Sequence, residues 1–118
     1  MGQPVQHFEI NSRDFKKAQQ FYKQVFDWNI QEHEGMPYAL IAPEGERSIG
    51  GGIGQVQEGQ QPGITFYVTV DNLQAYLDRA EKSGGKTVLK PTPIPNVGSC
   101  AMFTDPDGNL VGLFRGQK

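Results

Sequence analysis

The chain lacks most of the features that would assign it to a specialised class of protein. Its 118 residues include one cysteine, so an internal disulfide framework is excluded. The formal net charge is only −2, and no block of like charge provides the basic face that nucleic acid requires. No apolar run approaches the roughly 18 residues needed to span a bilayer, and the first residues lack the basic and apolar regions of a signal peptide. We therefore expect a soluble, cytoplasmic protein with neither a nucleic-acid nor a membrane partner.

An alternating strand followed by an amphipathic helix opens the chain. From Val5 to Ile10, Phe8 and Ile10 point to one side of the strand, and His7 and Glu9 point to the other. Asn11, Ser12 and Asp14 carry short polar side chains of the kind that cap helices. Apolar residues then recur at helical spacing, at Phe15, Ala18, Tyr22 and Val25, which predicts a helix of about three turns. Strand-like segments follow at 38–42 and 49–53.

The same order of elements begins again at Ile64. Residues 64–70 form the strongest β-run in the chain, rich in branched and aromatic side chains. A second amphipathic helix starts near Leu73 and ends at two glycines. Strand-like residues follow at 87–89, then a proline-rich stretch, and two further strands close the chain. The order of one strand, one helix and three strands therefore occurs twice, which predicts an α+β fold. We expect a single domain (1–118) built from two βαβββ modules, at 4–58 and 62–116.

Several short motifs accompany this order. They are Phe21-Tyr22 and Phe26-Asp27-Trp28 near the end of the first helix, Val70-Asp71-Asn72-Leu73 before the second helix, Gly84-Gly85-Lys86 after it, and Thr104-Asp105-Pro106-Asp107-Gly108-Asn109 in the last turn. In this order and spacing, over residues 5–115, they resemble the vicinal oxygen chelate superfamily, which includes glyoxalase I, bleomycin-resistance proteins and extradiol dioxygenases. The resemblance implies that the paired modules form a curved mixed sheet around a cleft where the chemistry takes place.

The resemblance also implies where a metal would bind. Enzymes of the superfamily usually hold a divalent ion with four His, Glu or Gln side chains, one from each of four cleft strands. Three of the corresponding positions in this sequence are Val5, Thr65 and Gly112, and the fourth belongs on the strand at 48–57, which contains no Asp, Glu, His or Cys. We therefore expect no metal, no cofactor, and no metal-dependent glyoxalase I or dioxygenase activity.

The side chains on the predicted cleft face form the candidate site. His7 and Glu9 share that face with Val5 and could act as an acid/base pair, or could be a half-buried pair satisfied by its neighbours. The ligand-binding candidates are Thr65, Tyr67, Met102, Gly112 and Phe114, although the side of the sheet to which Met102 points is ambiguous. Glycine at position 112 and at positions 50–54 would leave room for a ligand, or would mark the close approach of another strand.

These residues support three hypotheses about function. The favoured one is a metal-free protein that binds a small organic molecule in the cleft between the modules. The second is an enzyme of the superfamily, a lyase, isomerase or dioxygenase-like protein, with a degenerate metal site or with metal-free chemistry at His7 and Glu9. The third is an interaction module without a ligand. By resemblance to ligand-sequestering members, the chain could form a homodimer, with modules paired within or between chains through the linker at 57–63.

Overall fold

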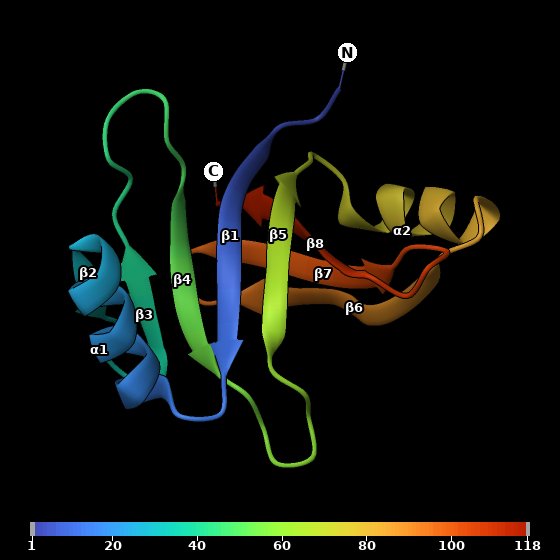
Figure 1. Cartoon of the computed structure of the whole chain (residues 1–118). Coiled ribbons are helices and arrows are strands. Elements are labelled where there is room, and N and C mark those ends of the chain that lie inside the picture. Colours follow the sequence, from blue (N-terminus) through green and yellow to red (C-terminus); the bar gives the residue numbers. More distant parts are fainter. Residues whose placement is uncertain (1, 118) are drawn as a thin grey trace. The chain divides into compact units, whose positions relative to one another are not determined.

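The computed structural model describes residues 2–117 and contains eight strands and two helices in that range. Along the chain (Figure 1) they are β1 (Val5–Ser12), α1 (Phe15–Phe26), β2 (Ile30–Glu32), β3 (Tyr38–Ile41), β4 (Gly50–Gln55), β5 (Gly63–Thr69), α2 (Leu73–Lys82), β6 (Lys86–Ile94), β7 (Gly98–Thr104) and β8 (Leu110–Gly116). The predicted order of strand, helix and three strands therefore occurs twice, and the α+β class is confirmed.

Contacts divide the chain into two compact units, which we describe separately. The N-terminal unit is His7–Thr65, and the C-terminal unit comprises the residues up to Gln6 together with those from Phe66 onward. The start of β1 belongs to the C-terminal unit, where the Thr69 N–H donates a hydrogen bond of 3.0 Å to the Pro4 carbonyl. Contacts thus group residues 4–6 with the C-terminal unit and residues 59–65 with the N-terminal unit, and the module limits at 4–58 and 62–116 stay a prediction.

The sheet of the N-terminal unit has the order β2-β3-β4-β1. The strands β1 and β4 pair in parallel, with Ile10 opposite Ile53, and the other neighbours are antiparallel. The helix α1 covers one face, and between helix and sheet lies a core that contains Ile10, Phe15 and Ile53. Because Phe8 also packs against this core, the alternation predicted for the first strand is confirmed.

The C-terminal unit repeats this arrangement. Its sheet has the order β5-β8-β7-β6, with β5 and β8 parallel and the other neighbours antiparallel. The helix α2 packs on β6, β7 and β8 (Figure 1). The core contains Val70, Leu73, Leu77 and Leu113, all less than a tenth exposed. Val70 thus takes the place in this unit that Ile10 takes in the other, as the internal repeat predicts.

Both helices begin at the polar residues that the sequence indicates. The Asp14 side chain accepts a hydrogen bond of 3.1 Å from the Lys17 N–H at the start of α1. The Asn72 side chain accepts one of 3.1 Å from the Ala75 N–H at the start of α2. These side chains satisfy backbone donors that have no partner within the helix. After α2 the chain turns at Gly84, whose φ of +103° is in the region that favours glycine.

One sequence-based expectation is wrong. The strand predicted at 87–89, before a proline-rich stretch, in fact continues through Pro91 and Pro93 as β6. It can do so because β6 is the outermost strand of its sheet and pairs with β7 alone, so a missing N–H can lie on the unpaired side. Its register with β7 shifts twice before Thr92, and such irregularities are common on edge strands.

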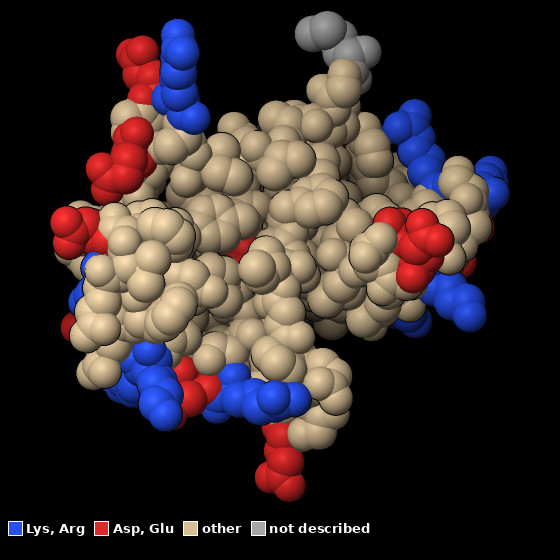
Figure 2. All heavy atoms as spheres, viewed as in Figure 1, with Lys and Arg blue, Asp and Glu red and all other residues tan. Residues whose placement is uncertain are grey.

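One face of the molecule (Figure 2) shows no strong charge bias among the described residues. On the face drawn in Figure 2, blue Lys and Arg side chains stand close to red Asp and Glu side chains, and the described residues form no extended patch of one sign there. This mixture agrees with the small net charge of −2. Neither α1 nor α2, the helices of the described range, is long and apolar enough to cross a membrane.

Candidate functional site

A pocket of about 650 Å³ lies in the N-terminal unit, and we call it the sheet pocket. Its wall consists of His7 on β1, Asn29 and residues 31–34 in and around β2, residues 40–43 at the end of β3, and Gly50 and Gly51 on β4. This volume lies in the range of pockets that bind small organic molecules.

The sheet pocket opens on the face of the sheet opposite α1. Ile30 and Ile41 belong to the core under the helix, and side chains alternate along a strand. Gln31 and Leu40, which are cross-strand partners, therefore point to the other face. His7 lies on that face too, because its neighbour Phe8 packs against the core. Alternation thus brings side chains from three strands to the same pocket.

Tyr38 fixes the position of His7. The Tyr38 hydroxyl lies 2.8 Å from His7 Nε2, at hydrogen-bonding distance. To reach His7, the Tyr38 side chain crosses β4 above its glycines, and a Cβ atom added at Gly52 would lie 1.9 Å from the Tyr38 hydroxyl oxygen. The space that glycine leaves at positions 52 and 54 is therefore filled by the protein's own tyrosine.

Burial lowers the pKa of His7 below its ordinary value of 6.5, and the nearby Glu9 carboxylate opposes this by raising the pKa. Burial has the larger effect on the pKa. The free-energy cost of removing the imidazolium from water exceeds the electrostatic stabilisation that the Glu9 carboxylate gives it. His7 is consequently neutral near pH 7. A neutral imidazole can accept or donate a proton, which suits a binding contact or acid–base chemistry.

This pKa shift makes the stability depend on pH. The lowered folded-state pKa means that the unfolded chain takes up the His7 proton first. The stabilising contribution is complete above the unfolded value of 6.5, and is lost as the pH falls through the lower folded value. We expect urea unfolding from about pH 7.5 to pH 5 to show this loss. His7→Gln should reduce the change in the free energy of unfolding over this pH range, whereas His33→Gln, at an exposed position, should not. Equal changes in the wild-type protein and both variants would contradict the assignment of this pH dependence to His7.

Replacing Gly52 with alanine should separate Tyr38 from His7. The added methyl group would occupy the position of the Tyr38 hydroxyl, so this side chain must move away. His7 then becomes more exposed, and its pKa should rise toward 6.5. NMR titration of the two histidine rings measures the change. Tyr38→Phe tests the hydroxyl separately, and an unaltered His7 titration in Gly52→Ala would show that the tyrosine does not depend on the glycine.

Three of the predicted ligand-binding residues lie side by side in the C-terminal unit. Gly112 on β8 is paired with Tyr67 on β5 and with Met102 on β7, so the three share one face. This settles the side to which Met102 points. A Cβ atom at Gly112 would lie 2.4 Å from the Tyr67 ring, which fills the space beside the glycine.

The other two predicted residues lie apart from that row. Phe114 is two residues further along β8, opposite Thr69 and Cys100, and Thr65 is 3% exposed. None of the five predicted residues lines the sheet pocket, whereas His7 does. Glu9 lies two residues from His7 on the same face of β1, outside the wall of that pocket.

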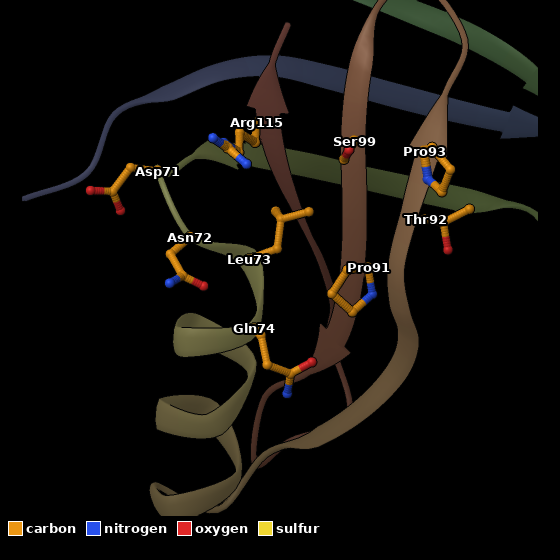
Figure 3. A pocket seen from close by; sticks show the side chains of 9 residues that line it. All are labelled: Asp71, Asn72, Leu73, Gln74, Pro91, Thr92, Pro93, Ser99 and Arg115. Atoms are coloured by element: carbon orange, nitrogen blue, oxygen red, sulfur yellow. The ribbon is translucent and has the colours of Figure 1, made fainter. Parts of the chain in front are cut away.

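A smaller pocket, of about 350 Å³, lies in the C-terminal unit at the start of α2 (Figure 3). Leu73 extends from the helix toward the strands, and Pro91 faces Gln74, whereas the Asp71 carboxylate points away. Arg115 stands at its upper edge in that view. This pocket contains none of the residues that the sequence selects for a site.

The residues present do not fit the divalent metal of the superfamily's enzymes. The side chains of Val5 and Gly112 have no donor atom, and the Tyr67 ring occupies the space beside Gly112. Thr65 contributes one hydroxyl, which is a weak metal ligand. Across residues 2–117, no group of three or more His, Cys, Asp or Glu side chains could hold a metal ion. Zinc sites, for comparison, usually have three or four protein ligands.

The polar edge of the sheet pocket was missed by sequence reasoning. It is made by Asn29, Gln31 and the run from Glu32 to Glu34. The strand β2 that carries part of it has only three residues, too few to show an alternating pattern. The available signal was Ile30, a single apolar residue between polar neighbours, which is 5% exposed in the core.

Solved structures share this fold over nearly the whole chain. Methylmalonyl-CoA epimerase from Mycobacterium tuberculosis has a TM-score of 0.68 at 20% identity, with 97% of this chain and 88% of that chain covered. A glyoxalase/bleomycin resistance protein/dioxygenase superfamily member from Vibrio splendidus 12B01 has a TM-score of 0.65 at 18% identity, with 97% and 99% covered. At these identities the likeness establishes the fold alone.

Relatives by sequence are similarly distant. A glyoxylase-like domain-containing protein of Didymella fabae is 29% identical over 112 residues, covering 89% of this chain and 88% of the relative. The anthracycline biosynthesis protein DnrV of Streptomyces peucetius is 23% identical over 124 residues, covering 92% of this chain and 45% of DnrV. The protein CFP32 of Mycobacterium tuberculosis (strain CDC 1551 / Oshkosh) is 26% identical over 116 residues, covering 93% of this chain and 44% of CFP32. The chain thus spans less than half the length of these last two relatives.

Family membership follows from a direct match. The model of the Glyoxalase/Bleomycin resistance protein/Dioxygenase superfamily matches residues 5–113, almost the whole chain. This range includes both βαβββ repeats and confirms the resemblance based on the sequence motifs. The chain belongs to the Glyoxalase/Bleomycin resistance protein/Dioxygenase superfamily.

Proposed function

We propose that the protein binds a small organic molecule in the sheet pocket and does so without a divalent metal. The observation that carries this proposal is the pocket itself, about 650 Å³ on the face of the N-terminal sheet opposite α1. In chains of this superfamily that face is the expected place for chemistry. The lack of a suitable donor set among the described residues supports binding that uses protein groups alone.

The wall of the pocket has the composition of a small-molecule site. Leu40, Ala42 and Pro43 supply an apolar surface, and Gly50, the partner of His7 on β4, adds no side chain on that face. Asn29 and Gln31 supply amide donors and acceptors at the edge. A mostly apolar wall with a few polar groups binds a ligand by burial and orients it by hydrogen bonds. His7, held by Tyr38, adds a neutral imidazole.

The printed names of two similar proteins support a small-molecule role. DnrV is named for anthracycline biosynthesis, and one structural neighbour is an epimerase of methylmalonyl-CoA. We infer by analogy that this chain also acts on or binds a metabolite-sized molecule. Tyr67, Met102, Gly112, Phe114 and Thr65 stay predicted ligand contacts, and a homodimer stays a prediction.

Filling the sheet pocket should abolish binding. Ala42 is half-buried in its wall, so Ala42→Trp would occupy the space that the ligand needs. We expect EDTA-treated wild-type protein to gain melting temperature with some members of a diverse library of small organic compounds, because binding to the native state alone raises stability. Ala42→Trp should lose these shifts. The matched control is Ala75→Trp, at an exposed position on α2.

Two outcomes of this screen would overturn the proposal. One is the absence of any shift in the wild-type protein, which would favour an interaction module without a ligand. The other is an equal set of shifts in wild-type protein and Ala42→Trp, which would move binding to another place.

A second candidate function is metal-free acid–base catalysis. The observation that favours it is the hydrogen bond of 2.8 Å between Tyr38 and His7, which orients an imidazole at the wall of the pocket. Oriented bases of this kind transfer protons in lyases and isomerases. If a library compound is turned over by the EDTA-treated protein, His7→Ala should slow turnover by about 100-fold or more. Unchanged turnover would remove His7 from catalysis and leave binding as its role.

A further inference from the structure

The strand β4 carries no side chain on the face of its sheet that lies opposite α1. Ile53 belongs to the core under the helix, and side chains alternate along a strand. The residues of β4 on the opposite face are therefore Gly50, Gly52 and Gly54. Because β4 lies between β1 and β3 (Figure 1), its bare backbone separates the side chains of these two neighbours. We call these three residues the glycine floor.

The Tyr38 ring lies along most of the glycine floor. Tyr38 is the cross-strand partner of Gly54, where a Cβ atom would lie 3.4 Å from the Tyr38 Cδ1 atom. A Cβ atom at Gly52 would overlap the hydroxyl end of the same side chain. The ring thus extends along β4 toward Gly50, and its hydroxyl lies 2.8 Å from His7 Nε2. His7 and its partner Gly50 line the sheet pocket, whereas Tyr38 does not, so the phenol covers the continuation of the pocket's floor.

The corresponding strand of the C-terminal unit has no such floor. The strand β8 pairs in parallel with β5, as β4 does with β1. On the face that carries Gly112, however, β8 also carries the side chains of Leu110 and Phe114. A row of bare backbone is thus a property of the unit that contains the sheet pocket, and a flat ring can lie against it without meeting a side chain.

Rotation of the Tyr38 side chain would uncover the glycine floor without a change in the sheet. Tyr38 is partly exposed and is the first residue of β3, directly after an exposed turn at 33–37. A change of χ1 moves the ring to another staggered position. The bond between its hydroxyl and the His7 imidazole is then lost, but the net contribution of one neutral hydrogen bond is small. A ligand with a flat ring and a hydroxyl would restore both contacts.

We propose that Tyr38 is a gate that the ligand displaces, with a flat aromatic ring of the ligand on the glycine floor and a ligand hydroxyl bonded to His7. This inference rests on the proposed function and adds the class of ligand to it, a hydroxylated planar aromatic compound. The Tyr38 side chain is itself a phenol, and it fits between the floor and His7. In the free protein Tyr38 competes with the ligand and lowers its affinity.

Binding of 2-naphthol to the EDTA-treated full chain tests the displacement directly. The titration is followed by NMR at about pH 7.5, where His7 is neutral. Nuclear Overhauser contacts between the Tyr38 ring and the Gly52 α-protons should disappear, and contacts from the naphthol ring to these protons should replace them. Ring signals of His7 should shift, and those of the exposed His33 should not.

Two further compounds test the class of ligand. Naphthalene lacks the hydroxyl and should bind about twofold to tenfold more weakly than 2-naphthol, the equilibrium effect of one neutral hydrogen bond. Decahydro-2-naphthol keeps the hydroxyl but has puckered rings, which cannot lie flat on the glycine floor. It should therefore bind more weakly than 2-naphthol, although it is more apolar.

Tyr38→Ala removes the competing ring and should tighten the binding of 2-naphthol by about twofold to tenfold in a calorimetric titration. Met36→Ala, at an exposed position in the turn before β3, should leave the affinity unchanged. Adding Gly52→Val to Tyr38→Ala places a side chain on the glycine floor and should cancel the gain.

Four results would each overturn the inference. They are failure of 2-naphthol to bind, contacts between Tyr38 and Gly52 that persist in the bound protein, equal or tighter binding of naphthalene or decahydro-2-naphthol, and a Tyr38→Ala affinity that shows no gain or keeps its gain with Gly52→Val. If library compounds still bind in an Ala42→Trp-sensitive manner, the proposed function survives that failure.

Discussion

Ile53→Ala is expected to lower the free energy of unfolding by about 2–5 kcal/mol, the usual range for removing a buried isoleucine side chain. Ile53 is fully buried, with 0% of its surface exposed, in the core between α1 and its sheet. It also lies opposite Ile10 of β1. Its loss leaves a cavity at the parallel pairing that joins the first and last strands of the repeat. Urea unfolding followed by circular dichroism measures the difference.

Ile64→Ala is the matched control for this variant. Ile64 is the same residue type on β5, the next strand along the chain, but 72% of its surface is exposed. Its truncation should change the free energy of unfolding by about 0.5 kcal/mol or less, as for surface substitutions in general. Equal losses in the two variants would contradict the position of the core, because the difference rests on burial alone.

Gly51→Ala is expected to destabilise the protein by about 1–3 kcal/mol, although alanine in place of glycine often stabilises a strand. The Phe8 ring lies over Gly51, and an added Cβ would stand 2.5 Å from two of its ring carbons. Phe8 in turn contacts Trp28, with ring centroids 5.8 Å apart. The ring can therefore move only by disturbing the aromatic packing at the end of α1. Thermal and urea unfolding should both register the loss.

Gly63→Ala provides the comparison. Gly63 is also a strand glycine, but a Cβ atom there would meet nothing within 4 Å. This substitution should leave the stability unchanged or raise it by up to about 1 kcal/mol, because alanine restricts the unfolded chain. A stabilised Gly51→Ala variant would mean that Phe8 does not cover β4.

Much of the fold could be predicted because its signals are local and repeated. Alternation in the first strand placed Phe8 and Ile10 in the core and His7 on the opposite face, and both hold. Cap residues such as Asp14 and Asn72 marked the starts of the two helices. The repeat made Val70 the counterpart of Ile10, and each lies in the core of its own unit.

The candidate site was less predictable, because it depends on how far side chains reach. The glycines on β4 were equally consistent with room for a ligand and with the close approach of another group. In the structure, the Tyr38 side chain fills the space beside Gly52, and the Tyr67 ring fills the space beside Gly112. Nothing in the periodicity of the sequence indicates a tyrosine that crosses a neighbouring strand. The polar edge at Glu32 and Glu34 escaped prediction since it lies on a strand of three residues and in the segment after it.

The measurement that tests the central claim most directly is a calorimetric titration of EDTA-treated protein with the library compound that raises its melting temperature most. Wild-type protein and Ala42→Trp are compared, each with and without added divalent metal. We predict saturable binding by the wild-type protein that needs no metal, and no binding by Ala42→Trp. Binding that appears only when metal is restored, or that persists with the pocket filled, would contradict the account.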